Sequence, residues 1–132
     1  MSIEQLEQLP VDQLSDPSGS HLYLWVTQKY LPIGLELLEI WGFKYQCIMT
    51  WVKSTGMTPY SWMYNTEHVL FARRGNLDLL RYGLKLSFDA SRTRHSEKPH
   101  VFYERVVAAS PGPRLEMFAR CEREGFVPWG TR

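Results

Sequence analysis

Short apolar runs that alternate with helical segments constrain the fold of this chain more than any other feature. Residues 21–26 (HLYLWV) are rich in β-forming side chains and predict a buried strand, which we expect to be parallel to its neighbour. Residues 31–41 then show helical periodicity, and Gly42 is the expected stop. The expected buried stripe of this helix consists of Leu31, Leu35, Leu38 and Trp41.

The same alternation continues through the rest of the chain. Two further strands are predicted at residues 45–53 and 67–75, and a fourth at residues 114–120. Between the last two, Ser96 is the expected N-cap of a second long helix. Its expected buried stripe is Phe102, Val106 and Ala109. Residues 77–91 show no clear pattern, although LKLSF could form a short strand. Strands that alternate with helices predict an α/β layered sheet.

The first ten residues (MSIEQLEQLP) predict a short helix with nothing before it. Ser2 and Gln5 have the spacing of a capping box, apolar residues follow at helical spacing, and Pro10 ends the turn. Doubly wound folds usually open with a strand and a ligand loop, and neither is present here. We therefore expect residues 1–132 to form a single domain that lacks its N-terminal strand, and hence a truncated one.

Composition excludes several classes of protein. With 44% hydrophobic and 14% aromatic residues the chain is not disordered, and a net charge of +1 provides no global attraction for nucleic acid. Two basic clusters, ARRGN and SRTRHSEK, are either solvated loops or local phosphate contacts. The two cysteines are not spaced as metal ligands are, so we expect no metal site and a location in the reducing cytoplasm. No apolar run is long enough to cross a membrane.

Two charged residues are candidates for ligand contacts. Glu116 lies within a predicted strand, where it could accept hydrogen bonds from ribose hydroxyls or simply face water at a sheet edge. Lys98 stands at the start of a predicted helix, where a cation opposes the helix dipole. That placement is compatible with an anionic ligand and also with a solvated lysine. No phosphate-binding glycine loop and no serine nucleophile motif occurs.

Six segments in order resemble a known family over essentially the whole chain. They are LYLWVT, WGF, WVK, NTEHVLFARRGN, HSEKP and SPGPRLEMFAR followed by GF and WG. The chain resembles the N6-adenine methyltransferases of the messenger-RNA adenosine methyltransferase type, which include bacterial and phage members. The resemblance implies a Rossmann-like α/β sandwich. It also implies methyl transfer from S-adenosylmethionine to the exocyclic amine of adenine in DNA or RNA.

The resemblance also implies roles for particular residues. Lys98 matches a family lysine near the carboxylate of the cofactor, and two residues match groups on its ribose side, Glu116 and Arg120. Four residues fall near the acceptor base and are expected to contact the substrate: Lys53, Trp62, Asn65 and Glu67.

The sequence departs from the family at its catalytic motif. Asp-Pro-Pro-Trp holds the adenine amine and stacks on the base, and no copy occurs in these residues. The nearest string, Asp16-Pro17-Ser18, lacks the second proline and the aromatic residue. At the other end, Thr131 and Arg132 replace a polar pair that contacts the cofactor in relatives. We therefore expect the chain alone to be inactive and to bind S-adenosylmethionine weakly or not at all.

Three interpretations remain open at this stage. The chain could be a pseudoenzyme that binds nucleic acid or supports an active partner subunit. It could be a fragment, or a misplaced start, of an active methyltransferase. It could also form homo- or hetero-oligomers that cover the exposed edges of its sheet.

Overall fold

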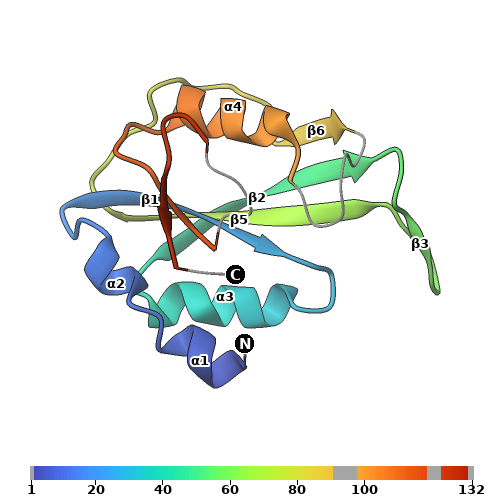
Figure 1. Ribbon diagram of the computed structural model, residues 1–132, viewed down its shortest axis with the longest axis horizontal. Helices are drawn as coiled ribbons and strands as arrows, with labels where there is room; N and C mark the ends of the chain where they lie inside the picture. The colour runs from blue at the N-terminus through green and yellow to red at the C-terminus, as the bar shows by residue number, and fades with distance from the viewer. Residues whose placement is uncertain (1, 91–97, 119–122, 131–132) are drawn as a thin grey trace.

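A three-layer α/β arrangement is present in the computed structural model, which describes residues 2–90, 98–118 and 123–130. The middle layer is a four-stranded sheet in the order β1-β5-β2-β6. Its strands are β1 (Gly19–Val26), β2 (Lys44–Lys53), β5 (Thr66–Gly75) and β6 (Ser87–Ala90). Helix α3 (Leu31–Ile40) covers one face and helix α4 (His100–Ala109) covers the other (Figure 1). This confirms the predicted α/β class and fits a Rossmann-like methyltransferase fragment.

Strand direction differs from the expectation for residues 21–26. Strand β1 pairs with β5 in antiparallel register, and β5 is also antiparallel to β2. Within the described part of this sheet, β2 and β6 are the pair that runs parallel. The prediction of a parallel neighbour for β1 is therefore wrong. Its apolar run reflects cover on both faces by helices, and that burial does not depend on the direction of the adjacent strand.

Helix α3 confirms the predicted helix and most of its predicted buried stripe. Gly42, with a φ of 85°, follows its C-cap in the left-handed conformation that suits glycine. Leu35, expected to be buried, is 37% exposed, whereas Leu37 is 5% exposed. Leu38 and Trp41 are buried as predicted, and Leu31 packs against the same cluster. The sheet-facing side also carries Gly34 and Leu37, so Leu35 is the one predicted member that turns outward.

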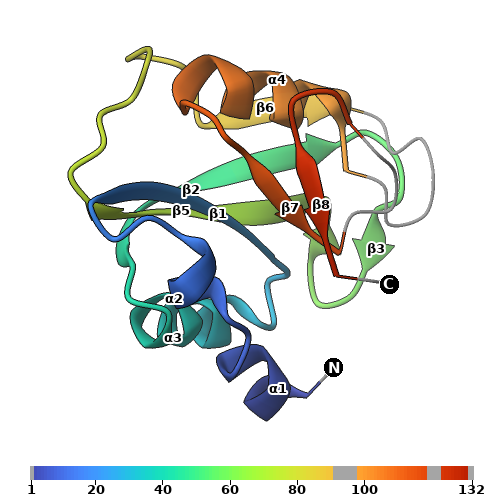
Figure 2. The ribbon, with the colours of Figure 1, turned by 60° about the vertical axis from the view of Figure 1, so that its left-hand side comes forward.

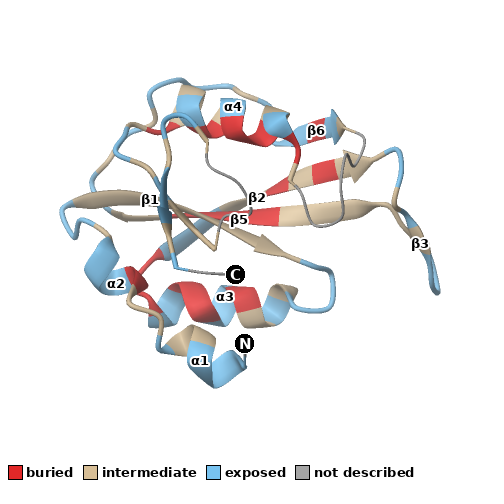
Figure 3. Cartoon of the chain, in the orientation of Figure 1, coloured by how far each residue is buried: buried red, intermediate tan, exposed pale blue. Residues whose placement is uncertain are grey.

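Two hydrophobic clusters lie on opposite faces of the sheet, where Figure 3 shows the buried sides of α3 and α4 turned toward it. The cluster under α3 includes Leu38, Trp41 and Leu70. The cluster under α4 includes Trp51, Val69 and Phe102. Phe102 and Val106 are buried as predicted, while Ala109 is only half-buried. The expected N-cap at Ser96 lies outside the described residues, and the cap observed for α4 is Pro99.

The first residues form two short helices beside α3. Helix α1 (Ile3–Glu7) has the predicted capping box, in which Ser2 and Gln5 exchange hydrogen bonds. Helix α2 (Val11–Leu14) was not predicted, because its four residues are too few for a periodic pattern. The indole N–H of Trp41 donates to the Leu6 carbonyl at 3.2 Å and connects α1 to α3.

In the part of the chain that the structure describes, four short strands lie outside the main sheet. Strands β3 (Thr58–Pro59) and β4 (Met63–Tyr64) pair within the loop after β2. Strands β7 (Leu115–Met117) and β8 (Val127–Trp129) pair in parallel with each other (Figure 2). The predicted strand at 114–120 is thus shorter than expected and does not join the main sheet. Phe118, with a φ of 60°, ends it.

The pair β7–β8 reaches the clusters on both faces of the sheet. Met117 packs against the cluster under α3, and Phe126 packs against the cluster under α4.

Strand β1, which pairs only with β5 within the described residues, forms one edge of the sheet. Among those same residues, no helix is both long and apolar enough to cross a membrane.

Candidate functional site

Three of the predicted site residues meet at one end of the sheet. Glu67 lies near the start of β5, Lys53 is the last residue of β2, and Lys98 directly precedes the N-cap of α4. The Lys53 ammonium donates to Glu67 Oε2 at 3.2 Å, and the Lys98 ammonium donates to Glu67 Oε1 at 3.1 Å. We call this trio the lysine–glutamate cluster.

The electrostatics of the cluster favour ionised groups. Burial raises the pKa of Glu67, but the charges and hydrogen bonds of Lys98 and Lys53 outweigh it and hold that pKa below its ordinary value. Two ammonium groups and one carboxylate leave the cluster with an excess positive charge.

Aromatic rings hold the two ammonium groups. Lys98 Nζ lies 4.6 Å from the centre of the Trp25 ring, and Lys53 Nζ lies 5.8 Å from the centre of the Trp51 ring. The Lys98 side chain is 28% exposed, compared with 10% for Lys53. Lys98 is therefore fixed in place and still reachable from solvent, as a group that receives an anion must be.

Two other predicted substrate residues do not contact this cluster through their side chains. Asn65 contributes its main-chain carbonyl, which accepts the backbone N–H of Lys53 at 2.8 Å. Trp62 lies in the β3–β4 loop and is 80% exposed. The structure thus places Trp62 on the surface, without a ring contact to any described aromatic residue.

Glu116 connects β7 to helix α4. Its Oε2 accepts a hydrogen bond from the Tyr103 hydroxyl at 2.5 Å. Burial, together with the adjacent Glu116 carboxylate, raises the pKa of Tyr103 far above its ordinary value, so this hydroxyl remains a donor. The guanidinium of Arg123 lies 3.7 Å from the centre of the Tyr103 ring. Arg120, the third predicted cofactor residue, lies outside the described residues.

Sequence reasoning missed Trp25 and Tyr103. Trp25 pairs with Val69 in the β1–β5 register, and its side chain therefore lies on the same face as Glu67, two residues away along β5. Tyr103 is five residues after Lys98 in the first turns of α4. The antiparallel β1–β5 register places Trp25 beside the cluster and would have identified it as a site residue. The parallel neighbour expected for residues 21–26 does not lead to this register.

The donor set fits an organic cofactor better than a metal. Within residues 2–90, 98–118 and 123–130 no group of three or more metal-ligating side chains occurs. An exposed ammonium suits a carboxylate, and the Glu116 carboxylate suits hydroxyl groups. The α/β fold and these two groups are compatible with an organic ligand that carries a carboxylate and hydroxyl groups.

Comparison with known proteins makes the assignment specific. The family model MT-A70 matches residues 1–132, and the chain belongs to this family. It is 31% identical over 130 residues to the N(6)-adenosine-methyltransferase MT-A70-like protein of Drosophila melanogaster. This match covers 91% of this chain and 21% of the fly protein.

Two further relatives agree with this assignment. The human N(6)-adenosine-methyltransferase catalytic subunit METTL3 is 30% identical over 127 residues, covering 89% of this chain and 22% of the relative. A probable N(6)-adenosine-methyltransferase MT-A70-like protein of rice, Oryza sativa subsp. japonica, is 33% identical over 109 residues. This match covers 75% of this chain and 15% of the rice protein. The chain thus spans about a fifth of the length of the relatives it matches.

Proposed function

We propose that this chain provides cofactor-binding groups for S-adenosylmethionine-dependent N6-methylation of adenine in RNA, and that it does not transfer the methyl group alone. The lysine–glutamate cluster carries this proposal, because it fixes the Lys98 ammonium at the start of α4 and leaves excess positive charge there. Membership of the MT-A70 family supports the reaction, and the names of the relatives support adenosine as the acceptor.

Each residue of the cluster has a distinct part in this proposal. An ammonium has three N–H donors, and Lys98 uses one of them on Glu67. The other two can donate to the carboxylate of the cofactor, while Trp25 and Glu67 prevent Lys98 from turning away. Glu67 is therefore a positioning residue.

Glu116 and Arg120 are assigned to the ribose side of the cofactor. A carboxylate can accept several hydrogen bonds, so Glu116 can hold Tyr103 and a ribose hydroxyl at the same time. The cofactor supplies the methyl group when it is bound.

The acceptor side is assigned to the end of β2, the start of β5 and the loop between them. Lys53 lies at the end of β2, and the exposed ring of Trp62 is available to stack on a base. Asn65 follows in the same loop. The 132 residues of this sequence contain no Asp-Pro-Pro-Trp motif to hold the adenine amine, and we therefore propose no methyl transfer by these residues alone.

Methyl transfer with labelled S-adenosylmethionine tests this assignment. We expect no incorporation into adenine-containing RNA or DNA above a control that carries both Lys98→Ala and Glu116→Ala. Fusion to a segment that carries Asp-Pro-Pro-Trp should produce incorporation into RNA, and Lys98→Ala should abolish it. Incorporation by the unfused chain, or a fused enzyme indifferent to Lys98→Ala, would refute the proposal.

A second candidate function is a non-catalytic subunit that pairs with another chain. The observation in its favour is the β1 edge, because within the described residues Gly19–Val26 pairs on one side only. An unpaired edge is a template for a strand from a partner or a second copy. Sedimentation velocity at micromolar concentration tests self-association: a dimer supports pairing between copies, and a monomer counts against it.

A further inference from the structure

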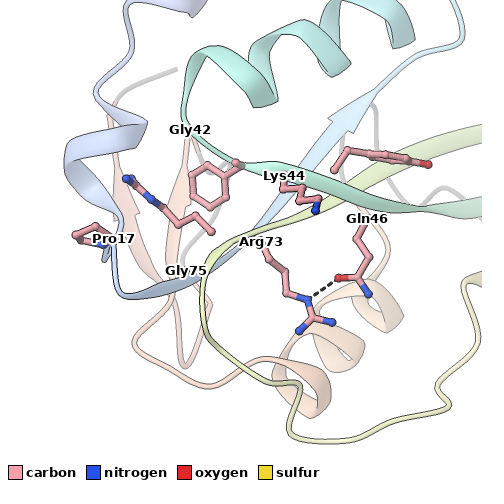
Figure 4. A pocket seen from close by; sticks show the side chains of 9 residues that line it. Pro17, Gly42, Lys44, Gln46, Arg73 and Gly75 are labelled. Atoms are coloured by element: carbon pink, nitrogen blue, oxygen red, sulfur yellow. Dashed lines mark hydrogen bonds between the residues drawn. The ribbon is translucent and has the colours of Figure 1, made fainter.

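An open hollow lies at the end of the sheet opposite the lysine–glutamate cluster. Its volume is about 730 Å³, and Lys44, Gln46 and Arg73 project into it from neighbouring strands (Figure 4). Arg73 and Glu67 lie on the same face of β5, six residues apart, which places them about 20 Å from each other. The hollow is therefore separate from the candidate cofactor site.

Two positive charges face each other across the strands that border this hollow. Lys44 on β2 is directly opposite Arg73 on β5 in the antiparallel register. Like charges at directly opposed positions destabilise a sheet. Across the described ranges neither side chain makes a salt bridge, whereas the adjacent Arg74 is paired with Asp12 at 2.5 Å. An anion bound between Lys44 and Arg73 would remove this unfavourable pairing.

Neighbouring groups hold Arg73 in a defined orientation. Its Nε donates to Gln46 Oε1 at 2.5 Å, and its Nη1 donates to the Leu77 carbonyl at 3.4 Å. Gln46 stands at the register shift of β2, where an extra residue brings its side chain to Arg73. A guanidinium has five N–H donors, so three remain for a ligand. Such a fork is suited to two oxygens of one phosphate.

An aromatic side chain borders the same hollow. Tyr45 is 43% exposed and lines the hollow from the opposite face of β2, because it pairs with Ala72 whereas Lys44 pairs with Arg73. Cations that contact a backbone, combined with an exposed ring, are typical of surfaces that bind single-stranded nucleic acid. Because the net charge of the chain is only +1, such binding has to come from a local site.

We propose that this hollow binds the phosphodiester backbone of single-stranded RNA. Lys44 and Arg73 contact phosphate oxygens, and Tyr45 stacks on an unpaired base. The choice of RNA among polyanions rests on the proposed function. The site would anchor the RNA at a distance from the acceptor adenine, independently of cofactor binding.

Fluorescence anisotropy with labelled oligouridylate tests this proposal on the full chain. This probe contains no adenine, so a failure of acceptor recognition or of cofactor binding does not affect the result. The variant Lys44→Ala with Arg73→Ala should bind about tenfold more weakly. Its plot of log affinity against log salt should be shallower by about 1.4, which is the value for two lost phosphate contacts on a single strand.

A charge-matched control isolates the site from general electrostatics. Lys29→Ala with Lys85→Ala removes two exposed cations that do not line the hollow. Its affinity and salt slope should stay close to those of the unmodified chain. Equal losses in the two double variants would overturn the proposal. Tighter binding of duplex RNA than of the single strand would also overturn it.

Stability provides a readout that does not depend on RNA. Lys44→Gln removes one of the two opposed charges, and so the Tm of this variant should be higher than that of the unmodified chain. A lower Tm would show that Lys44 has a structural role and would contradict the unfavourable pairing.

Discussion

Replacing Glu67 by glutamine tests how strongly the lysine–glutamate cluster is held. The substitution keeps the size of the side chain but removes the carboxylate that bridges the two ammonium groups. Hydrogen bonds to charged groups contribute about 1.5–3 kcal/mol when buried, whereas exposed ion pairs contribute about 0–1 kcal/mol. The side-chain exposures of Lys53, Glu67 and Lys98 are 10%, 21% and 28%, between these limits.

From these limits we expect each bond to contribute about 1 kcal/mol and Glu67→Gln to cost about 2 kcal/mol of the free energy of unfolding. In urea, with a slope of about 2 kcal/mol per molar, the unfolding midpoint should fall by about 1 M. Glu36→Gln is the matched control, since Glu36 is exposed on α3 and forms no salt bridge within the described residues. It should change stability by less than about 0.5 kcal/mol.

Acid titration provides a second readout of the same variant. Because the pKa of Glu67 is lowered in the folded state, its stabilising contribution is present above the ordinary value of 4.5 and is lost as the pH falls below it. Glu67→Gln should therefore weaken the dependence of stability on pH in this range. Equal stability of Glu67→Gln and Glu36→Gln, with the same acid dependence, would refute the reasoning.

Two further predictions concern packing and a half-buried histidine. A Cβ at Gly34 would lie 2.6 Å from Val26 Cγ1 and 3.0 Å from Leu70 Cδ1. Gly34→Ala should therefore lower the free energy of unfolding by about 1–3 kcal/mol, although alanine has a better helix propensity than glycine. Urea unfolding measures this change. His21 hydrogen-bonds with Ser110 at 2.6 Å, and burial lowers its pKa, so stability should fall as the pH drops below 6.5. In thermal unfolding His21→Gln should flatten this fall, and an unchanged pH profile would contradict the assignment.

The sequence predicted the helices and strands better than their arrangement. Capping at Ser2, the stop at Gly42 and the helix at α3 depend on local chemistry, and all three are confirmed. The direction of β1 depends on β5, which follows it by some forty residues and inserts beside it. Local patterns contain no information about such pairing.

The candidate site was predicted partly by pattern and mostly by resemblance. The position of Lys98 at a helix start already made it a ligand candidate, whereas resemblance alone selected Lys53 and Glu67. Only the fold shows that the three share hydrogen bonds. Trp25 and Tyr103 were missed because large aromatic residues in this chain are also core residues. A sequence does not distinguish a ring that supports an ammonium from one that only fills space.

Binding of S-adenosylmethionine is the most direct test of the account, and nuclear magnetic resonance on ¹⁵N-labelled chain can measure it. The account predicts weak, saturable shifts of backbone amides near Lys98, Tyr103 and Glu116, with a Kd of about 1 mM. Lys98→Ala should abolish these shifts, whereas Lys29→Ala should leave them unchanged. No saturable shift up to about 5 mM, or an identical titration of Lys98→Ala, would contradict the claim that these residues bind the cofactor.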